Sequence, residues 1–242
     1  MSYANEPYRS GLGDYAAMAA ADERTTFISK TYLHLAGAIA VFAGLSAVML
    51  TTPADRPIAE VLVETFLGSR FGWLLVLGAF MLVSMVASNW AQSATSSGTQ
   101  YAGLGLYVLA QSIIFAPLLY IANRIDPSVI PSAAMTTLVL FGGLTLAVFI
   151  TRKDFSFLRT ILVFGSFAAF GFIVIAILFH FQIGAVFLYA MVALACGFIL
   201  YDTSNVLHHY RIGQHVAAAL ALFASVALLF WYIIQIFLSR RD

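Results

Sequence analysis

The sequence predicts an all-α integral membrane protein, built as a bundle of seven transmembrane helices. Hydrophobic residues make up 62% of the 242 residues and charged residues only 10%, with a mean hydropathy of +0.93. An average soluble domain has about 25% charged residues. The chain also contains seven apolar segments, each of about 20 residues, which is the length that a helix needs to cross the hydrocarbon core. Both observations exclude an ordinary soluble domain.

Charge, cysteine content and motifs narrow the function classes. The net charge of +1 gives no basic surface for nucleic acid, and the single cysteine, Cys196, excludes an internal disulfide and a cysteine-based metal cluster. The sequence contains no HExxH motif, no GxSxG motif and no glycine-rich phosphate loop. We therefore expect no catalytic residues, no metal and no cofactor, and we predict that the protein is not an enzyme.

The first 30 residues differ in composition from the rest of the chain. They are polar, carry charges of both signs, and lack the apolar core of a signal peptide. We expect residues 1–30 to form a mobile cytoplasmic tail, with a short interfacial helix over Asp14 to Ala21. The membrane domain is then expected to cover residues 31–242.

Apolar length places the seven spans, and polar or proline-containing turns separate them. The segment 58–67 is amphipathic but too short to cross a bilayer. The expected spans are 31–50, 71–90, 101–121, 132–151, 158–179, 183–207 and 216–238.

Two of these spans carry polar residues at a spacing of four, which puts each set on one helix face. We interpret both sets as contacts between helices in preference to the lining of a pore. Gly103 and Gly105 open the third span and are expected to allow close helix approach. The polar sets are Ser84, Ser88 and Gln92 in the second span, and Tyr107 and Gln111 in the third.

Lysine and arginine in the loops indicate the orientation. The side of the membrane that holds the N-terminus carries seven of these residues and the other side carries five, which favours a cytoplasmic N-terminus. An odd number of spans then places the C-terminus on the opposite side. If Arg240 and Arg241 are instead cytoplasmic, the sixth or seventh span is re-entrant. The two sets are Arg9, Arg24, Lys30, Arg152, Lys153, Arg159 and Arg211, against Arg56, Arg70, Arg124, Arg240 and Arg241.

The most informative stretch is GFILYDTSNVLHHY, residues 197–210, because Asp202 is the only acidic residue clearly inside an apolar segment. A carboxylate at membrane depth is costly and usually faces the bundle interior or a watery cavity. Asn205 and His209 follow it by three and seven residues and are expected on the same face. Asp202 either contacts an ion or hydrogen-bonds a neighbouring helix; His208, His209 and His215 are expected in an interfacial loop.

This stretch resembles the tyrosine–aspartate signature of the Bax inhibitor-1 family, the transmembrane Bax-inhibitor-motif proteins, and of its bacterial members in particular. QYAGLGLYVLAQSIIFAPLLYIA, residues 100–122, is similar to the third span of that family, and IIQIF, residues 233–237, to the end of its last helix. The resemblance implies a seven-helix fold with the last helix central. It also implies a multi-pass protein of the bacterial inner membrane.

The resemblance implies a mechanism as well. Some family members are described as proton-sensitive calcium leak channels, in which two aspartates on the last two helices share a proton. Asp202 matches the first aspartate, whereas Ser225 stands at the position of the second and cannot carry charge. The expected ion pathway and pH sensor thus comprise Asp202, Asn205, His209 and Ser225, with one titration step instead of two coupled steps.

Three functions stay open at this point. The protein is an ion leak that handles calcium or protons, with the lipid bilayer as its surroundings. Alternatively it modulates a membrane-bound ATP-dependent protease or another membrane-protein partner without transport, as some bacterial relatives are described to do. A third possibility is a structural role in stress protection. The sequence predicts neither ion selectivity nor oligomeric state.

Overall fold

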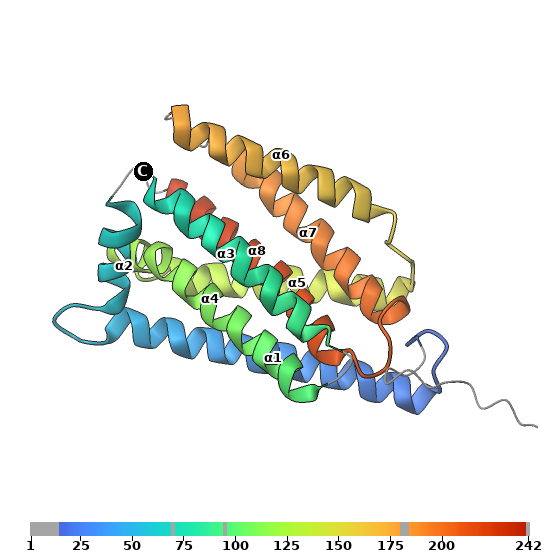
Figure 1. Ribbon diagram of the computed structural model, residues 1–242. Helices are drawn as coiled ribbons and strands as arrows, with labels where there is room; N and C mark the ends of the chain where they lie inside the picture. Colours follow the sequence, from blue (N-terminus) through green and yellow to red (C-terminus); the bar gives the residue numbers. More distant parts are fainter. Residues whose placement is uncertain (1–14, 69–70, 94–95, 180–183, 241–242) are drawn as a thin grey trace, which may run out of the picture.

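The computed structural model describes residues 15–68, 71–93, 96–179 and 184–240, and it shows a bundle of α-helices packed side by side (Figure 1). Seven helices are long and apolar enough to cross a membrane, which confirms the predicted class; α2 is too short. The helices are α1 (Ala21–Thr51), α2 (Ile58–Leu67), α3 (Gly72–Ala91), α4 (Ser97–Ile125), α5 (Val129–Thr151), α6 (Leu158–Phe179), α7 (Ala185–His208) and α8 (His215–Ser239).

The first helix begins earlier than expected, at Ala21 instead of near Thr31. Asp22 and Glu23 lie in its first turn, where negative side chains interact favourably with the positive end of the helix dipole. The helix has 31 residues, or roughly 46 Å at 1.5 Å per residue, which is more than a bilayer core of about 30 Å requires. The boundary at residue 30 between tail and membrane domain therefore falls within a continuous helix.

The segment just before α1 is folded onto another part of the chain. Tyr15 pairs with Arg211 in an isolated bridge, and the Ala16 N–H donates to the Tyr210 carbonyl at 2.9 Å. The Arg211 guanidinium lies over the Tyr15 ring, 4.9 Å from its centroid. The helix expected over 14–21 is wrong for residues 15–20, which form a turn, and Asp14 lies outside the described residues. Local backbone pairing with the α7–α8 loop replaces helix formation here.

The last helix is the most buried of the seven spans. It packs against α1, α3, α4, α5 and α7, whereas α6 packs on α7 at the edge of the bundle (Figure 1). A last helix enclosed by all six others is therefore not confirmed, although α8 holds most of the core. Small side chains suit a helix in the core such as α8, because helices in lipid associate through close packing and not through exclusion of water.

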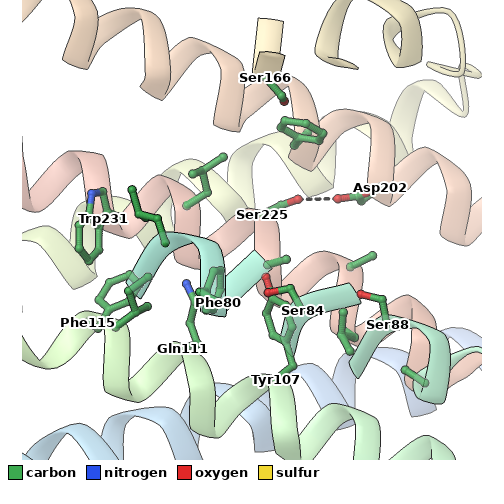
Figure 2. A pocket seen from close by; sticks show the side chains of 18 of the residues that line it. Phe80, Ser84, Ser88, Tyr107, Gln111, Phe115, Ser166, Asp202, Ser225 and Trp231 are labelled. Atoms are coloured by element: carbon green, nitrogen blue, oxygen red, sulfur yellow. Dashed lines mark hydrogen bonds between the residues drawn. The ribbon is translucent and has the colours of Figure 1, made fainter. Parts of the chain in front are cut away.

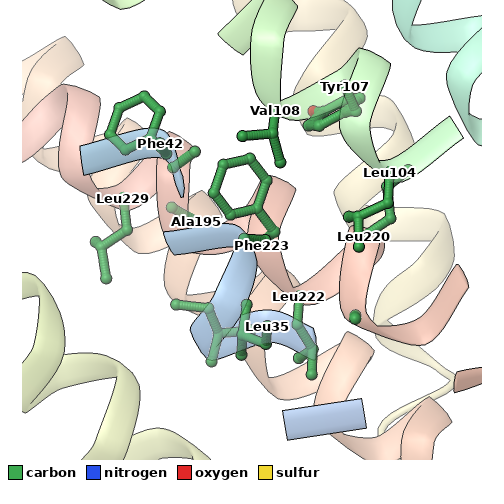
Figure 3. Close-up of a cluster of buried hydrophobic side chains, with 14 of the residues drawn as sticks. Leu35, Phe42, Leu104, Tyr107, Val108, Ala195, Leu220, Leu222, Phe223 and Leu229 are labelled. Atoms are coloured by element: carbon green, nitrogen blue, oxygen red, sulfur yellow. The ribbon is translucent and has the colours of Figure 1, made fainter. Parts of the chain in front are cut away.

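Aromatic packing fixes α1 and α4 against α8 (Figure 3). Phe42 of α1 lies edge-on to Phe223 of α8 and to Phe115 of α4, with ring centroids 5.9 and 5.0 Å apart. Phe223 also lies edge-on to Tyr107 of α4. Such edge-to-face pairs are each worth about 0.5–1.5 kcal/mol beyond simple area burial, so this cluster holds α4 in a defined position beside α8.

A single glycine controls the contact between α3 and α4. A Cβ atom added at Gly103 would lie 2.5 Å from the Ala87 carbonyl oxygen and 2.6 Å from the Ala91 nitrogen. These are backbone atoms and cannot move aside without moving the helix. The close approach predicted for Gly103 is confirmed, whereas a Cβ at Gly105 would meet nothing within 4 Å, so that part of the prediction is wrong.

Candidate functional site

A cavity of about 590 Å³ lies between α3, α4, α6, α7 and α8 (Figure 2). It combines one carboxylate, several hydroxyl and amide groups, and a large share of aromatic rings. Its lining consists of Trp73, Leu77, Phe80, Ser84, Ser88, Ala91, Gln92, Tyr107, Gln111, Ile114, Phe115, Ser166, Ile173, Phe198, Asp202, Tyr210, Ala217, Leu220, Ala221, Ala224, Ser225, Leu228, Trp231 and Tyr232.

Asp202 and Ser225 meet at this cavity. Ser225 Oγ donates a hydrogen bond of 2.5 Å to Asp202 Oδ2, and the two residues are only 4% and 8% exposed, respectively. Ser225 is the one hydrogen-bond partner found for the Asp202 carboxylate within the described part of the chain. The structure therefore brings together the two residues that the sequence placed on the last two spans, with a neutral donor where a second carboxylate was expected from the family.

The two polar stripes predicted from spacing also line this cavity. The sequence favoured contacts between helices over the lining of a pore for these residues; in the structure α3 and α4 both turn their polar faces toward the same space. Ser84 Oγ and Gln111 Oε1 are buried and have no hydrogen-bond partner among the described residues. Buried polar atoms are normally satisfied, so these two oxygens can accept hydrogen bonds from water or from a bound molecule.

Among the described residues, Asp202 is the only charged side chain of the lining, and no lysine, arginine or histidine of that part of the chain joins it. A buried carboxylate without a cationic partner favours the approach of a positive ion or ligand, since an uncompensated charge is costly in a low-dielectric surrounding. The electrostatic character of the cavity is therefore anionic whenever Asp202 is ionised.

Asn205 and His209 do not join this cavity, contrary to prediction. His209 is the C-cap residue of α7, so its direction no longer follows the helical repeat that places it below Asp202. Its Nε2 donates instead to Asp154 Oδ2 at 3.0 Å. Asn205 is half-buried, and its carbonyl oxygen accepts the N–H groups of His209 and Tyr210.

Asp154 was not singled out from the sequence, yet it ties the α5–α6 loop to the end of α7. Its Oδ1 accepts the Ser156 N–H at 2.8 Å, and the Phe155 N–H donates to Ser204 Oγ at 2.9 Å. The Asp-x-Ser spacing, which favours such a turn, is the signal that could have revealed it. Burial opposes ionisation of Asp154, but the Ser156 N–H and His209 outweigh it and lower the pKa of the carboxyl.

We expect Asp154→Asn to lower stability slightly at pH 7, because Asn keeps the turn but loses the charge that pairs with His209. The group is nearly half exposed, at 44%, so solvent screening limits the loss to about 0.5–1 kcal/mol. A lowered pKa stabilises the fold above the ordinary value of 3.8 and ceases to do so as the pH falls through the folded value. Thermal unfolding from pH 7 to pH 3 should show the two proteins converging at the acid end, with the exposed Asp55→Asn as control. A difference that is independent of pH would contradict the ion-pair explanation.

Tyr210 was also missed, although it lies at the end of the signature stretch. Burial and the nearby Asp202 carboxylate raise its pKa well above the ordinary value, so its hydroxyl remains protonated. Trp73 and Trp231 also line the cavity, and their rings stack with centroids 6.0 Å apart. Trp231 follows Ala224 and Leu228 at helical spacing, which is the signal that places it on the same face of α8.

Three other histidines of the described residues, His34, His208 and His215, lie outside this cavity. His208 Nδ1 lies 3.0 Å from the Ser204 carbonyl oxygen, and the ring of His215 lies 4.9 Å from that of His34 on α1. Across the described ranges, no group of three or more histidine, cysteine or acidic side chains is placed to hold a metal ion. The described histidines therefore contribute to helix ends and helix contacts.

Comparison with known proteins agrees with this architecture. Residues 24–242 match the model of the family described as "Inhibitor of apoptosis-promoting Bax1". Protein LIFEGUARD 4 of Arabidopsis thaliana is 28% identical over 88% of this chain and 85% of its own length, and Protein LIFEGUARD 3 of the same plant is 27% identical over 88% and 84%. An uncharacterized protein of Pseudomonas aeruginosa is 29% identical over 65% of this chain and 68% of its own length. The family match covers nearly the whole chain, so this multi-pass membrane protein belongs to the Bax inhibitor family.

Proposed function

We propose that this protein is a pH-sensitive cation leak in which Asp202 is the titrating group. The observation that carries the proposal is the anionic cavity, which has one buried carboxylate and no cationic side chain among the described residues of its lining. Calcium is the cation that the family resemblance implies. We propose the bacterial inner membrane as the location, on the same resemblance and with a bacterial relative in its support.

The chemistry follows from the protonation of one group. Ionised Asp202 attracts a cation into the cavity, and protonated Asp202 does not. Ca²⁺ takes six to eight oxygen ligands, and Asp202, Ser84, Ser88 and Gln111 offer side-chain oxygens around the same space. These side chains carry fewer oxygens than a dehydrated calcium ion requires, so the ion would move through with part of its water shell.

The test is calcium flux through purified protein in liposomes between pH 5 and pH 8. We expect flux to rise with pH in a single step, because one carboxylate without a carboxylate partner titrates once. Flux no greater than in protein-free liposomes, or flux that does not change with pH, would overturn the proposal.

Modulation of a membrane-bound protease remains the alternative. The observation in its favour is the polar N-terminal segment, whose described part docks on the α7–α8 loop through Ala16 and Tyr210. Deletion of residues 1–20 leaves α1 intact, unlike deletion of the whole expected tail. If the full-length protein crosslinks to a protease and the deletion abolishes this crosslinking, the alternative is supported. If the crosslinking persists after the deletion, recognition through this segment is excluded.

A further inference from the structure

We infer that the cavity binds a protonated amine with an apolar, preferably aromatic, body. The first observation is the size of the cavity. Its volume of about 590 Å³ lies in the range of small-molecule sites, about 300–1,000 Å³, and far exceeds the space that one metal ion fills. The inference rests on the proposed function in one respect only, since both use ionised Asp202 as the partner of a cation.

The second observation is the aromatic end of the cavity. Trp231 stacks on Trp73 with ring centroids 6.0 Å apart and meets Phe115 edge-on at 4.9 Å. Figure 2 shows Trp231 and Phe115 toward one end of the cavity and Asp202 toward the other, with its partner Ser225 nearer the middle. Aromatic rings attract both apolar groups and cations, and a transport path for a hydrated metal ion has no need of them.

The third observation is the set of unpaired acceptors between these ends. Along the horizontal direction of Figure 2, Gln111 and Ser84 lie between Trp231 and Asp202, below Ser225. Gln111 Oε1 and Ser84 Oγ are buried without a partner among the described residues. A protonated amine supplies up to three N–H donors, so it can pair with Asp202 and also satisfy such oxygens. A quaternary ammonium or a hydrocarbon chain cannot.

Taken together, the ends of the cavity match the two ends of an arylalkyl amine. The ammonium would pair with the Asp202 carboxylate, whose Oδ2 is already held in place by Ser225. The apolar body would lie against Trp231 and Phe115. An acyl chain of a neutral lipid would fill the aromatic end equally well but would leave Asp202 without a counter-charge.

The test uses 4-phenylbutylammonium as the probe and uncharged 4-phenylbutanol as its matched control. Binding is measured by calorimetry on the full-length protein in nanodiscs of zwitterionic lipid, with empty nanodiscs subtracted. We expect the amine to bind at least tenfold more tightly than the alcohol. Equal affinity of the two probes would overturn the inference and assign the cavity to apolar molecules.

Two variants separate the ends of the site. Asp202→Asn should weaken amine binding at least tenfold and leave the alcohol unchanged. Trp231→Leu should weaken both probes several-fold, whereas Trp90→Leu serves as its control, because Trp90 is 44% exposed and absent from the lining. Helical content by circular dichroism verifies that each variant folds. Amine binding that is unaffected by both cavity variants would place the amine outside the cavity and contradict the inference.

Binding and flux are measured separately, so the two proposals can fail separately. Amine binding without calcium flux would retain the site and remove the leak function. Calcium flux without amine binding would retain the leak and overturn the inference about the amine.

Discussion

Asp202→Asn should abolish most of the pH dependence of calcium flux between pH 5 and pH 8. Asparagine has the shape of the acid and can still accept the hydrogen bond from Ser225 Oγ, so folding should be intact. It carries no charge, and flux at pH 8 should fall roughly tenfold, to the level of the wild type at pH 5. Tenfold corresponds to ~1.4 kcal/mol, the scale of one contact to a charged group.

The matching gain-of-function variant is Ser225→Asp. It would place a second carboxylate within hydrogen-bonding reach of Asp202, because the Ser225 and Asp202 side chains are already 2.5 Å apart. Two carboxylates this close cannot both ionise easily, and they titrate as a pair. We expect the flux profile to change from one step to two.

Superimposable profiles for the wild type and Asp202→Asn would show that Asp202 is not the sensor, and the leak proposal would lose its titrating group.

Gly103→Ala should destabilise the bundle. The new Cβ would collide with the backbone of α3 at Ala87 and Ala91. Overpacking of this kind costs about 1–3 kcal/mol, and the better helix propensity of alanine offsets up to about 1 kcal/mol of it. Thermal unfolding in detergent should show a clearly lower transition temperature.

Gly105→Ala is the matched control, two positions further along the same helix. A Cβ there meets nothing within 4 Å, so only the gain in helix propensity remains, and stability should be equal or slightly higher. If both variants lose stability equally, the close contact between α3 and α4 is not what Gly103 provides.

The sequence was enough to predict the class, the number of spans and most of their ends. Apolar length determines where a helix can cross a bilayer, because every backbone polar group there must be satisfied within the helix. The short helix at Ile58–Leu67 and the span at Leu158–Phe179 were predicted with their observed bounds. The start of α1 was not, because hydropathy marks where the membrane begins and not where a helix does.

Side-chain spacing predicted which residues share a face, but not what that face meets. Ser84 and Gln111 lie on helices that are adjacent in sequence, and only the packing of α3 and α4 beside α8 turns both toward Asp202. Helical spacing predicted the wrong position for the His209 side chain, because α7 ends one residue earlier. The His209 side chain instead hydrogen-bonds Asp154, which lies in a loop far away in the sequence.

What the sequence alone determined, then, is local: helix length, polar periodicity, and the isolation of Asp202 in an apolar segment. What only the tertiary structure decided is which helices meet. Close packing and the pairing of polar groups decide which helices associate in lipid, and both depend on residues that are far apart in the chain. The contact at Gly103, the bond from Ser225 to Asp202, and the aromatic end at Trp231 all arise between different helices, so no periodicity within one helix could reveal them.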